Sequence, residues 1–223
     1  MAIGDVTDRS VRVWLREPGG TAELALVVGG EVVGRAAAEA DPEHDHVAVA
    51  ILECDRPRPD EAFEVRVGSV VRSGVFGPTP GSPAAFNFLF GSCHQPFTDR
   101  LEDGRVERHP GAAIYPRIRD LAQRRRTAFA MWLGDQVYSD SVAEASVREK
   151  LAEDPSVTDE TLLDTYRHLY RGFFNERGYR ELAEALPAYL MWDDHDIFDG
   201  WGSLIDHTAF DERVYRAAEK AFR

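Results

Sequence analysis

The sequence predicts a chain in two parts, an all-β sandwich over residues 1 to 80 and an α/β layered domain over residues 81 to 223. Short extended runs broken by Gly, Pro and Asp fill the first part, whereas apolar runs alternating with helical patterns fill the second. The segment "FGPTPGSPAA", residues 76 to 85, concentrates Pro, Gly and Ser, as linkers and domain borders do. A length of 223 residues also suits one large or two modest domains.

The first part is predicted to be a small immunoglobulin-like or fibronectin-like domain. Its extended runs alternate apolar and polar residues with a period of two: "VRVWLR", "AELALVV", "HVAVAILE" and "EAFEVRVGSVV". The segments between these runs carry turn residues: "EPGG", "ADPEHD" and "DRPRPD". Alternation interrupted by Gly, Pro and Asp at this spacing favours an antiparallel sandwich over helices.

The second part contains three apolar runs, each followed by Gly and polar residues: "FNFLFGSCHQP", "TAFAMWLGDQVYSD" and "PAYLMWDDHDIFDG". The helical patterns between them cover residues 112 to 126, 141 to 153, 159 to 174 and 178 to 186. Buried strands that alternate with helices indicate an α/β layered domain, in which ligands usually bind outside the carboxyl ends of the strands. All three polar clusters fall at that position.

Composition and charge exclude several classes of function. The 39 acidic and 26 basic side chains give a formal net charge of −13, which repels polyanions and argues against general nucleic-acid binding. No window approaches the roughly 18 consecutive apolar residues of a membrane span. The two cysteines, Cys54 and Cys93, imply no disulfide framework. Since "MAIGDVTDRSVRVW" does not resemble a secretory signal, we expect a cytoplasmic location, or a secreted one if the chain lacks its natural start. The sequence does not indicate the oligomeric state.

The three polar clusters contain the candidate catalytic and metal-binding residues. Each candidate could also have a purely structural role. Cys93 alone is typical of a small buried hydrophobe, and Asp135 and Tyr138 in "GDQVY" are typical of a turn. The acids of "WDDHD", residues 192 to 196, form either a solvated loop or a cation site, because adjacent carboxylates repel one another and are costly to desolvate without a cation. Because the clusters end three successive predicted strands, they offer a thiolate, a phenolate, carboxylates and an imidazole together.

Three motifs, in this order and after a β-sandwich, resemble the alkaline phosphatase D (PhoD-like) family of metallophosphoesterases: "GSC" at 91 to 93, "GDQVY" at 134 to 138 and "WDDHDIFDGWGS" at 192 to 203. The third motif is long and specific, and the first two are short. Wider metallophosphoesterases open their first motif with D-x-H, and the "GSCH" found here is a change that the PhoD-like family shares. The resemblance implies a four-layer α/β/β/α catalytic domain, of which this chain holds the N-terminal portion, and metal-dependent hydrolysis of small-molecule phosphate monoesters or diesters.

The resemblance also implies roles for individual residues. Cys93 and Tyr138 would bind a ferric ion. Asp135 would bridge that ion and a calcium ion held by Asp194, and His195 would be the catalytic residue that donates a hydrogen bond to the phosphate. A thiolate suits a transition metal and carboxylates suit harder cations, so a mixed centre agrees with the residue types, with Mn²⁺, Mg²⁺ and Zn²⁺ as alternatives. The competing interpretation of His195 is an ordinary core or surface histidine.

Several residues of the third motif keep two interpretations. Asp193, Asp196 and Asp199 are either further ligands or residues that orient the ligands. Trp192 and Trp201 either shield the site from water or pack in the core.

Two other functions compete with phosphate-ester hydrolysis. One is a β-sandwich binding module fused to an incomplete, inactive phosphoesterase half, and the other is a calcium-stabilised structural protein, which leaves Cys93 and Tyr138 unexplained. Because the family supplies further ligands beyond the third motif, we expect the isolated chain to be a fragment with weak or absent activity, unless Asp206 or His207 completes the site.

Overall fold

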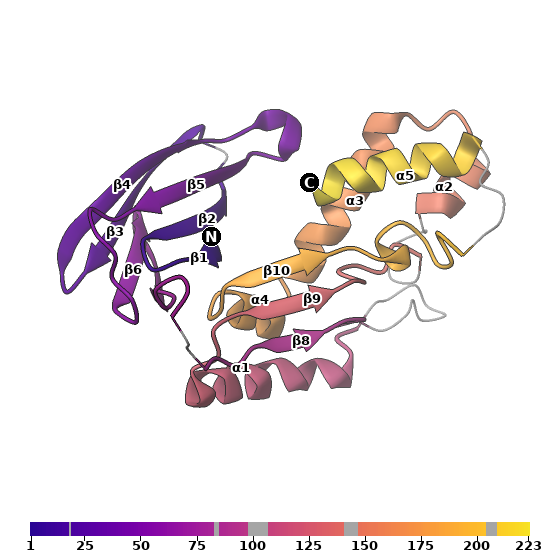
Figure 1. Cartoon of the computed structure of the whole chain (residues 1–223). Coiled ribbons are helices and arrows are strands. Elements are labelled where there is room, and N and C mark those ends of the chain that lie inside the picture. The colour runs from indigo at the N-terminus through magenta and orange to yellow at the C-terminus, as the bar shows by residue number, and fades with distance from the viewer. Residues whose placement is uncertain (18, 83–84, 98–106, 141–146, 204–208) are drawn as a thin grey trace. The chain divides into compact units, whose positions relative to one another are not determined.

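The computed structural model describes residues 1 to 223 except 18, 83–84, 98–106, 141–146 and 204–208 (Figure 1). The chain divides into two compact units. The first unit comprises Met1–Leu89, Ile118–Ala130 and Glu181–Tyr189, and the second comprises Phe90–Arg117, Met131–Arg180 and Leu190–Arg223. The border predicted at residue 80 stays a prediction.

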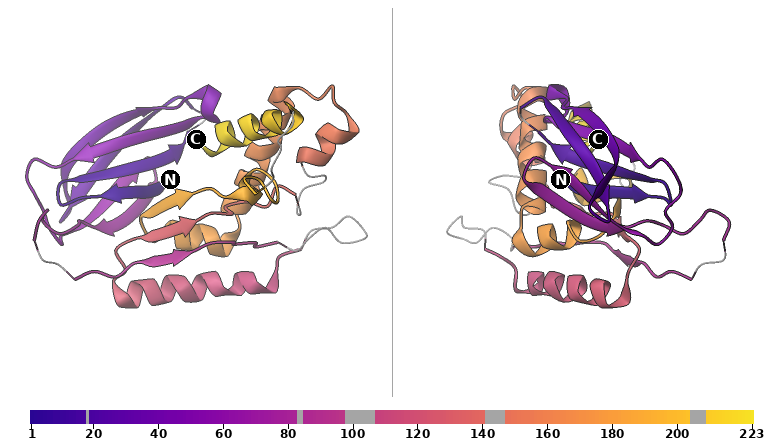
Figure 2. Two further views of the ribbon diagram at one scale, coloured as in Figure 1. Left: turned by 45° about the vertical axis from the view of Figure 1, so that its right-hand side comes forward. Right: turned by 90° about the vertical axis from the view of Figure 1, so that its left-hand side faces the viewer.

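The N-terminal strands form two antiparallel sheets (Figure 2). The three-stranded sheet has the order β1-β2-β5, with β1 at Ala2–Val6, β2 at Ser10–Arg16 and β5 at Val47–Glu53. The four-stranded sheet has the order β4-β3-β6-β7, with β4 at Glu31–Glu39, β3 at Thr21–Val28, β6 at Ala62–Val67 and β7 at Val70–Val75. A 3₁₀ turn, η1 at Pro42–His44, precedes β5.

One hydrophobic core lies between these two sheets. In β2 the alternation of "SVRVWLR" buries Val11, Val13 and Leu15, while the residues between them face solvent. Leu24 and Leu26 of β3 belong to the same core cluster, so apolar residues of both sheets meet. The extended runs predicted from the period of two are therefore confirmed as strands, because that period places every second side chain on the buried face.

The three predicted apolar runs of the second part are the strands β8 at Leu89–Gly91, β9 at Ala130–Leu133 and β10 at Ala188–Met191. They form one sheet with the order β10-β9-β8, and their arrows point the same way in Figure 1. Their carboxyl ends therefore meet at one edge of the sheet, and all three polar clusters follow that edge. Within the described residues, the second part contains this one three-stranded sheet. The four-layer α/β/β/α arrangement, which needs two sheets, stays a prediction.

The helices follow the predicted patterns closely, with one addition. The structure has η2 at Pro110–Ala113, α1 at Ile114–Arg125, α2 at Val147–Glu153, α3 at Asp159–Phe174, α4 at Arg177–Ala183, η3 at Asp194–Asp196 and α5 at Ala209–Phe222. The predicted helix at 141 to 153 is confirmed over α2, and its first six residues lie outside the described residues. Helix α5 was not anticipated. Figure 1 shows α1 running beside β8, the last strand in the order of this sheet.

A second hydrophobic core fixes the segment that follows β10. Helix α3 buries Tyr166 and Phe173, and α5 adds Val214 and Ala218 to the same cluster. Ile197, just beyond η3, is buried in it as well. The backbone after β10 is thus held by α3 and α5, and this positions the acidic motif.

The two tryptophans of the third motif are part of that packing. Trp192 stacks on Phe222 with ring centroids 5.5 Å apart, and Trp201 stacks on Tyr215 at 5.1 Å. Their contacts with α5 favour the core-packing interpretation over that of a shield around the site. Within the described part of the chain, no helix has the length and apolar character needed to cross a bilayer.

Candidate metal centre

The turns at the ends of β8 and β9 place the first ligand candidates. Gly134 has φ +107°, and a Cβ atom there would lie 2.5 Å from Asp193 Cβ, so the position requires glycine. The next residue, Asp135, has φ +53°, and Cys93 after β8 has φ +57°. The Cys93 amide donates to the Gly134 carbonyl over 3.4 Å, which ties the two turns together. Left-handed backbone at non-glycine residues is uncommon and concentrates at functional sites.

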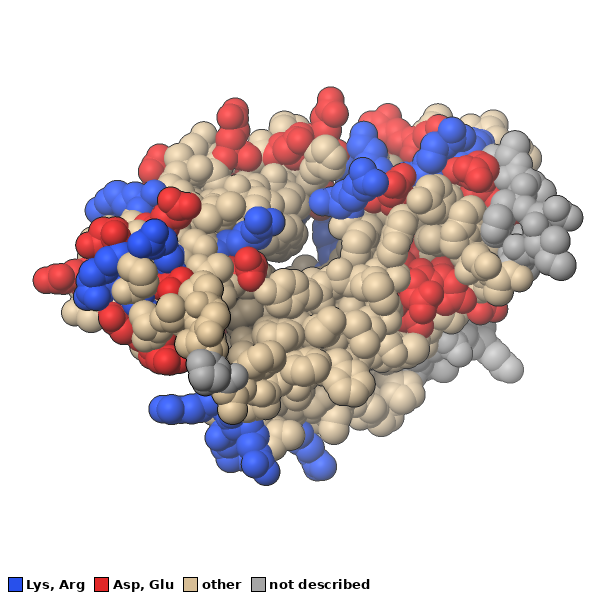
Figure 3. Space-filling view, viewed as in Figure 1, with Lys and Arg blue, Asp and Glu red and all other residues tan. Residues whose placement is uncertain are grey.

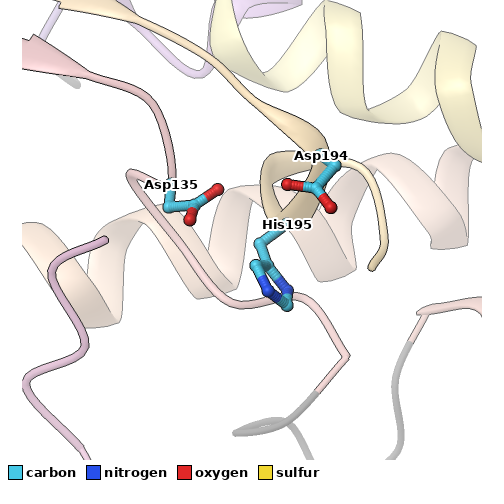
Figure 4. A group of neighbouring side chains, drawn as sticks. All are labelled: Asp135, Asp194 and His195. Atoms are coloured by element: carbon cyan, nitrogen blue, oxygen red, sulfur yellow. The ribbon is translucent and has the colours of Figure 1, made fainter. Parts of the chain in front are cut away.

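Asp135, Asp194 and His195 form one group of potential ligand atoms. One atom from each side chain lies within 4.8 Å of the others. Figure 4 shows the Asp135 and Asp194 carboxylates turned toward each other with the His195 ring beside them. Asp135 is buried, and its Oδ1 has no hydrogen-bond partner among the described residues. A buried carboxylate oxygen without a donor is costly unless a cation compensates it, so this group fits a metal ion.

Cys93 and Tyr138 meet the same carboxylate from another side. The Tyr138 hydroxyl donates to Asp135 Oδ2 over 3.4 Å, and the Cys93 side chain interacts with both Asp135 and Tyr138. Burial first, and then the Asp135 charge, raises the pKa of Tyr138. The hydrogen bond with Ser92 lowers the pKa of Cys93, but Asp135 and burial outweigh it, so that pKa is raised too. Asp135 is therefore the residue that the two sets of side chains share.

The His195 ring is held on two sides. Its Nδ1 lies 2.9 Å from Asp140 Oδ1, and its ring centroid lies 4.4 Å from that of Tyr138. Burial would lower the pKa of His195, but the hydrogen bond to Asp140 and the charge of nearby aspartates raise it. Asp140 Oδ2 also accepts the Asp199 amide at 3.1 Å. Asp140, His195 and Asp199 form a second group of potential ligand atoms within 4.8 Å.

Sequence reasoning missed Asp140. It lies five positions after Asp135, in the polar tail of the second motif, "GDQVYSD". Its proximity to His195 was not visible, because contact between two motifs more than 50 residues apart depends on how β9 and β10 are placed. The only available signal was a further carboxylate near the end of the motif.

The remaining acids of the third motif have separate functions in the structure. Asp194 Oδ2 accepts the Gly200 amide at 2.8 Å, in a turn where Gly200 has φ +80°. Asp196 is fully buried, and both of its carboxylate oxygens accept protein donors. Burial raises the pKa of Asp196 to about 6 against the effect of those donors. The protein donors on both oxygens favour the orienting interpretation of Asp196 over that of a ligand, while the side chain of Asp199 is exposed.

Three further candidates from the sequence do not join the ligand groups that the structure describes. His94, next to Cys93, is buried and stacks on Tyr179 at 4.2 Å, and burial lowers its pKa to about 4. Its ring thus packs in the interior and does not join the ligand groups. Asp206 and His207, the candidates for completing the site, lie outside the described residues.

Comparisons with known proteins agree with this geometry. The model of the PhoD-like phosphatase family matches residues 88–223. A solved structure of PhoD matches 99% of this chain with a TM-score of 0.71 at 18% identity, and this likeness shows the fold alone. The chain covers 44% of that structure, so it spans less than half of its length.

The other matches carry no argument. A β-glucuronidase from Bifidobacterium dentium, 12% identical, matches 87% of this chain and 44% of its own with a TM-score of only 0.28. None of the curated protein sequences that were compared gives a match. The family match, in contrast, covers more than half of the chain and includes all three motifs. The three motifs, the strand ends that carry them and this match lead to one conclusion: the chain belongs to the PhoD-like phosphatase family, a family of hydrolases.

Proposed function

We propose that this chain carries a metal centre for the hydrolysis of small-molecule phosphate esters, monoesters or diesters. The observation that carries the proposal is the position of Asp135. Its Oδ2 accepts the hydroxyl of Tyr138, beside Cys93, and its buried Oδ1 has no donor among the described residues. The same carboxylate belongs to the group with Asp194 and His195. A carboxylate shared by two donor sets supports a bridging role between two cations.

The donor types support a mixed pair of metals. Cys93 and Tyr138 would hold Fe³⁺, because thiolate and phenolate suit a transition metal. Asp194 would hold Ca²⁺ with Asp135 as the bridge, and Mn²⁺, Mg²⁺ or Zn²⁺ are alternatives. Bound there, such a pair would neutralise phosphate charge and lower the pKa of a water molecule.

His195 is proposed as the catalytic residue that contacts the phosphate. Asp140 accepts from Nδ1, so the proton on that nitrogen is fixed and Nε2 is the nitrogen left for the substrate. Burial would lower the pKa of His195, but the hydrogen bond to Asp140 and the nearby aspartates raise it, which favours the imidazolium form that can donate to a phosphoryl or leaving oxygen. The Tyr138 ring against the imidazole limits its rotation. Asp140 is thus a positioning residue for His195.

We also propose the architecture of the two domains, from the strand orders and from the likeness to PhoD. Strand orders β1-β2-β5 and β4-β3-β6-β7 suit a fibronectin-like sandwich over residues 1 to 80. The likeness to the solved PhoD structure supports a four-layer α/β/β/α domain to which residues 81 to 223 contribute their part. Metal ions and a small phosphate ester would be the partners of this domain.

Metal counting and two substitutions test the proposal. The chain is purified from medium containing iron and calcium, and bound metals are counted by elemental analysis beside the turnover of an aryl phosphate. Asp194→Ala should lower metal content and turnover together. His195→Ala should keep its metal and lose about 10²-fold or more in turnover, the usual scale for a general acid or a transition-state donor.

The control is Asp164→Ala, which removes an exposed acid of α3 and should change neither quantity. If His195→Ala turns over aryl phosphate like the unaltered chain, the role of His195 is wrong. If the unaltered chain binds no metal, the metal centre is wrong and the binding-module alternative takes its place.

A further inference from the structure

A buried carboxylate lies between the two turns that carry the proposed ligands. Asp196 is only two positions after Asp194, yet its side chain is fully buried, with 0% exposed. Its Oδ1 accepts the Gln136 amide at 3.0 Å, the Val137 amide at 3.3 Å and the Tyr170 hydroxyl at 2.9 Å. Its Oδ2 accepts the Asp193 amide at 2.9 Å and shares the Gln136 amide at 3.1 Å. Both oxygens are thus occupied by protein donors.

The identity of these donors connects Asp196 to the site. Gln136 and Val137 are the two residues between Asp135 and Tyr138, so the carboxylate binds the main chain between two proposed ligands. The Asp193 amide belongs to the turn that presents Asp194 and His195. One side chain therefore links the backbone of the second motif to that of the third. Hydrogen bonds to an ionised acceptor are stronger than those between neutral groups, so the link is stiff.

We propose that Asp196 is a positioning residue for the metal centre, which sets the separation between Asp135 and the third-motif residues Asp194 and His195. This role rests on the proposed function. Other contacts join the two motifs: the Gln136 side chain donates to the Met191 carbonyl at 2.9 Å, and Ser139 donates through its amide to the His195 carbonyl at 3.2 Å and through its hydroxyl to the Ile197 carbonyl at 2.8 Å. None of these contacts holds the main-chain amides of Gln136 and Val137. Asp196 is the residue whose acceptors reach the amides between two ligands. Outer groups that orient metal ligands typically contribute 10- to 100-fold to metal affinity.

Asp196→Asn tests this role because it keeps the shape of the side chain and changes one oxygen to an NH₂ donor. In either amide orientation that donor faces a backbone N–H, from Asp193 and Gln136 on one side or from Gln136 and Val137 on the other. The two turns should then separate. We expect Mn²⁺ alone, titrated into metal-free protein, to bind at least about 10-fold more weakly.

Tyr170→Phe is the matched control. It also removes a buried hydrogen bond to Asp196, but its hydroxyl comes from α3 and belongs to neither motif. Both variants should lower the melting temperature, whereas Tyr170→Phe should leave the affinity for Mn²⁺ within about 3-fold of that of the unaltered chain. In metal-free protein, hydrogen exchange of the Gln136 and Val137 amides should accelerate in Asp196→Asn more than in Tyr170→Phe.

Each outcome decides between a positioning role and a purely structural one. Equal affinities for Mn²⁺ in Asp196→Asn and the unaltered chain, or equal losses in both variants, would overturn the positioning role. No binding of Mn²⁺, Fe³⁺ or Ca²⁺ by the unaltered chain would instead overturn the proposed function, and the positioning role with it. If Asp196→Asn does not fold, Asp196→Ser provides the comparison, because it avoids the donor conflict and leaves room for a water molecule.

Discussion

Asp135 combines two energetically unfavourable features in one residue. Its backbone is left-handed, with φ +53°, and one of its buried oxygens has no donor among the described residues. Such costs persist where the surrounding structure holds them in place, and they concentrate at functional sites. Without a cation, this residue lowers the stability of the fold. A bound cation would convert the same oxygen into a stabilising contact, since ligands that bind only the native state add to its stability.

Tyr138 gives the proposed iron site an optical signature. Iron-loaded protein should show a visible charge-transfer band, since a phenolate that binds Fe³⁺ donates electron density to the metal. In Tyr138→Phe the phenolate-to-iron part of the absorption should disappear, while iron bound through Cys93 and Asp135, with the absorption of the thiolate, is retained in part. Absorption spectra and iron content of the two proteins measure this, and an unchanged band in the variant would remove Tyr138 from the ligand set.

Glu176, which lies outside the proposed metal centre, should make the free energy of unfolding depend on pH. Burial would raise its pKa, but hydrogen bonds from the Tyr179 amide at 2.7 Å and from Arg108 at 2.6 Å outweigh it, and the pKa is lowered from 4.5. The unfolded chain therefore takes up this proton at a higher pH than the folded chain does. The stabilisation by Glu176 is complete above about pH 4.5 and is lost as the pH falls through the lowered native value.

Glu176→Gln should accordingly lower the free energy of unfolding by about 1 to 3 kcal/mol at pH 7, the scale of a hydrogen bond to a charged group. The difference from the unaltered chain should shrink below about pH 4.5. Urea unfolding at several pH values measures it, with Glu160→Gln as an exposed control on α3. A difference that stays constant down to pH 3 would contradict the assignment.

At the scale of elements, the close approach of the turns after β9 and β10 depends on one glycine. Gly134→Ala would place a Cβ atom 2.5 Å from Asp193 Cβ at φ +107°, so both turns must shift. We expect a loss of about 2 to 4 kcal/mol in stability together with weaker metal binding. Gly172→Ala in α3 is the control: apart from its chain neighbours and the backbone of its own helix, no described atom lies within 4 Å of the new methyl group, and the change should stabilise the helix by about 0.5 to 1 kcal/mol. Thermal unfolding in the presence and absence of Mn²⁺ compares the two variants. Equal changes in melting temperature would refute the requirement for glycine at position 134.

The sequence predicted the strands well because their patterns are local. The alternation in β2 and the apolar runs of β8 to β10 each show their period or length within a few residues. Helix α5 was not predicted, because its buried face includes Ala217 and Ala218, and small side chains give a weak apolar signal. The separate roles of the third-motif acids could not be predicted from the sequence for another reason. In a 3₁₀ turn such as η3, successive side chains point in different directions, so Asp194 faces the ligand group while Asp196 faces the interior.

On the scale of the whole molecule, β8, β10 and the residues next to them expose several apolar side chains. Phe90 is 70% exposed and Met191 53%, and Phe88 and Tyr189 are also exposed. Phe129 joins this row, since it stacks on Phe88 at 5.3 Å and meets the edge of Tyr189 at 5.4 Å. Figure 3 shows a broad uncharged area over these strands, with acidic side chains gathered beyond their ends. Contiguous apolar surface of this kind is unusual in a monomeric soluble protein.

The folded chain should therefore bind the dye anilinonaphthalene sulfonate. A double variant, Phe90→Ser with Met191→Ser, should lose most of the fluorescence, because the most exposed apolar side chains of β8 and β10 are removed. Val49→Ser, which removes a comparably exposed apolar side chain from β5 of the sandwich, should leave the signal nearly unchanged. Equal fluorescence in all three proteins would place the dye elsewhere.

The distribution of the two cores along the chain has a consequence for synthesis on the ribosome. The sandwich core ends with Phe76, whereas the proposed metal centre lacks Asp194, His195 and Asp196 until residue 196 has been made. At about 5 to 20 residues per second, the roughly 120 residues between them take about 6 to 24 s to translate. The sandwich can therefore fold while Cys93, Asp135 and Tyr138 are still being added. During that interval the nascent chain carries the Cys93 thiol before Asp194 and His195 exist, so a metal ion that binds then meets an incomplete set of the proposed ligands.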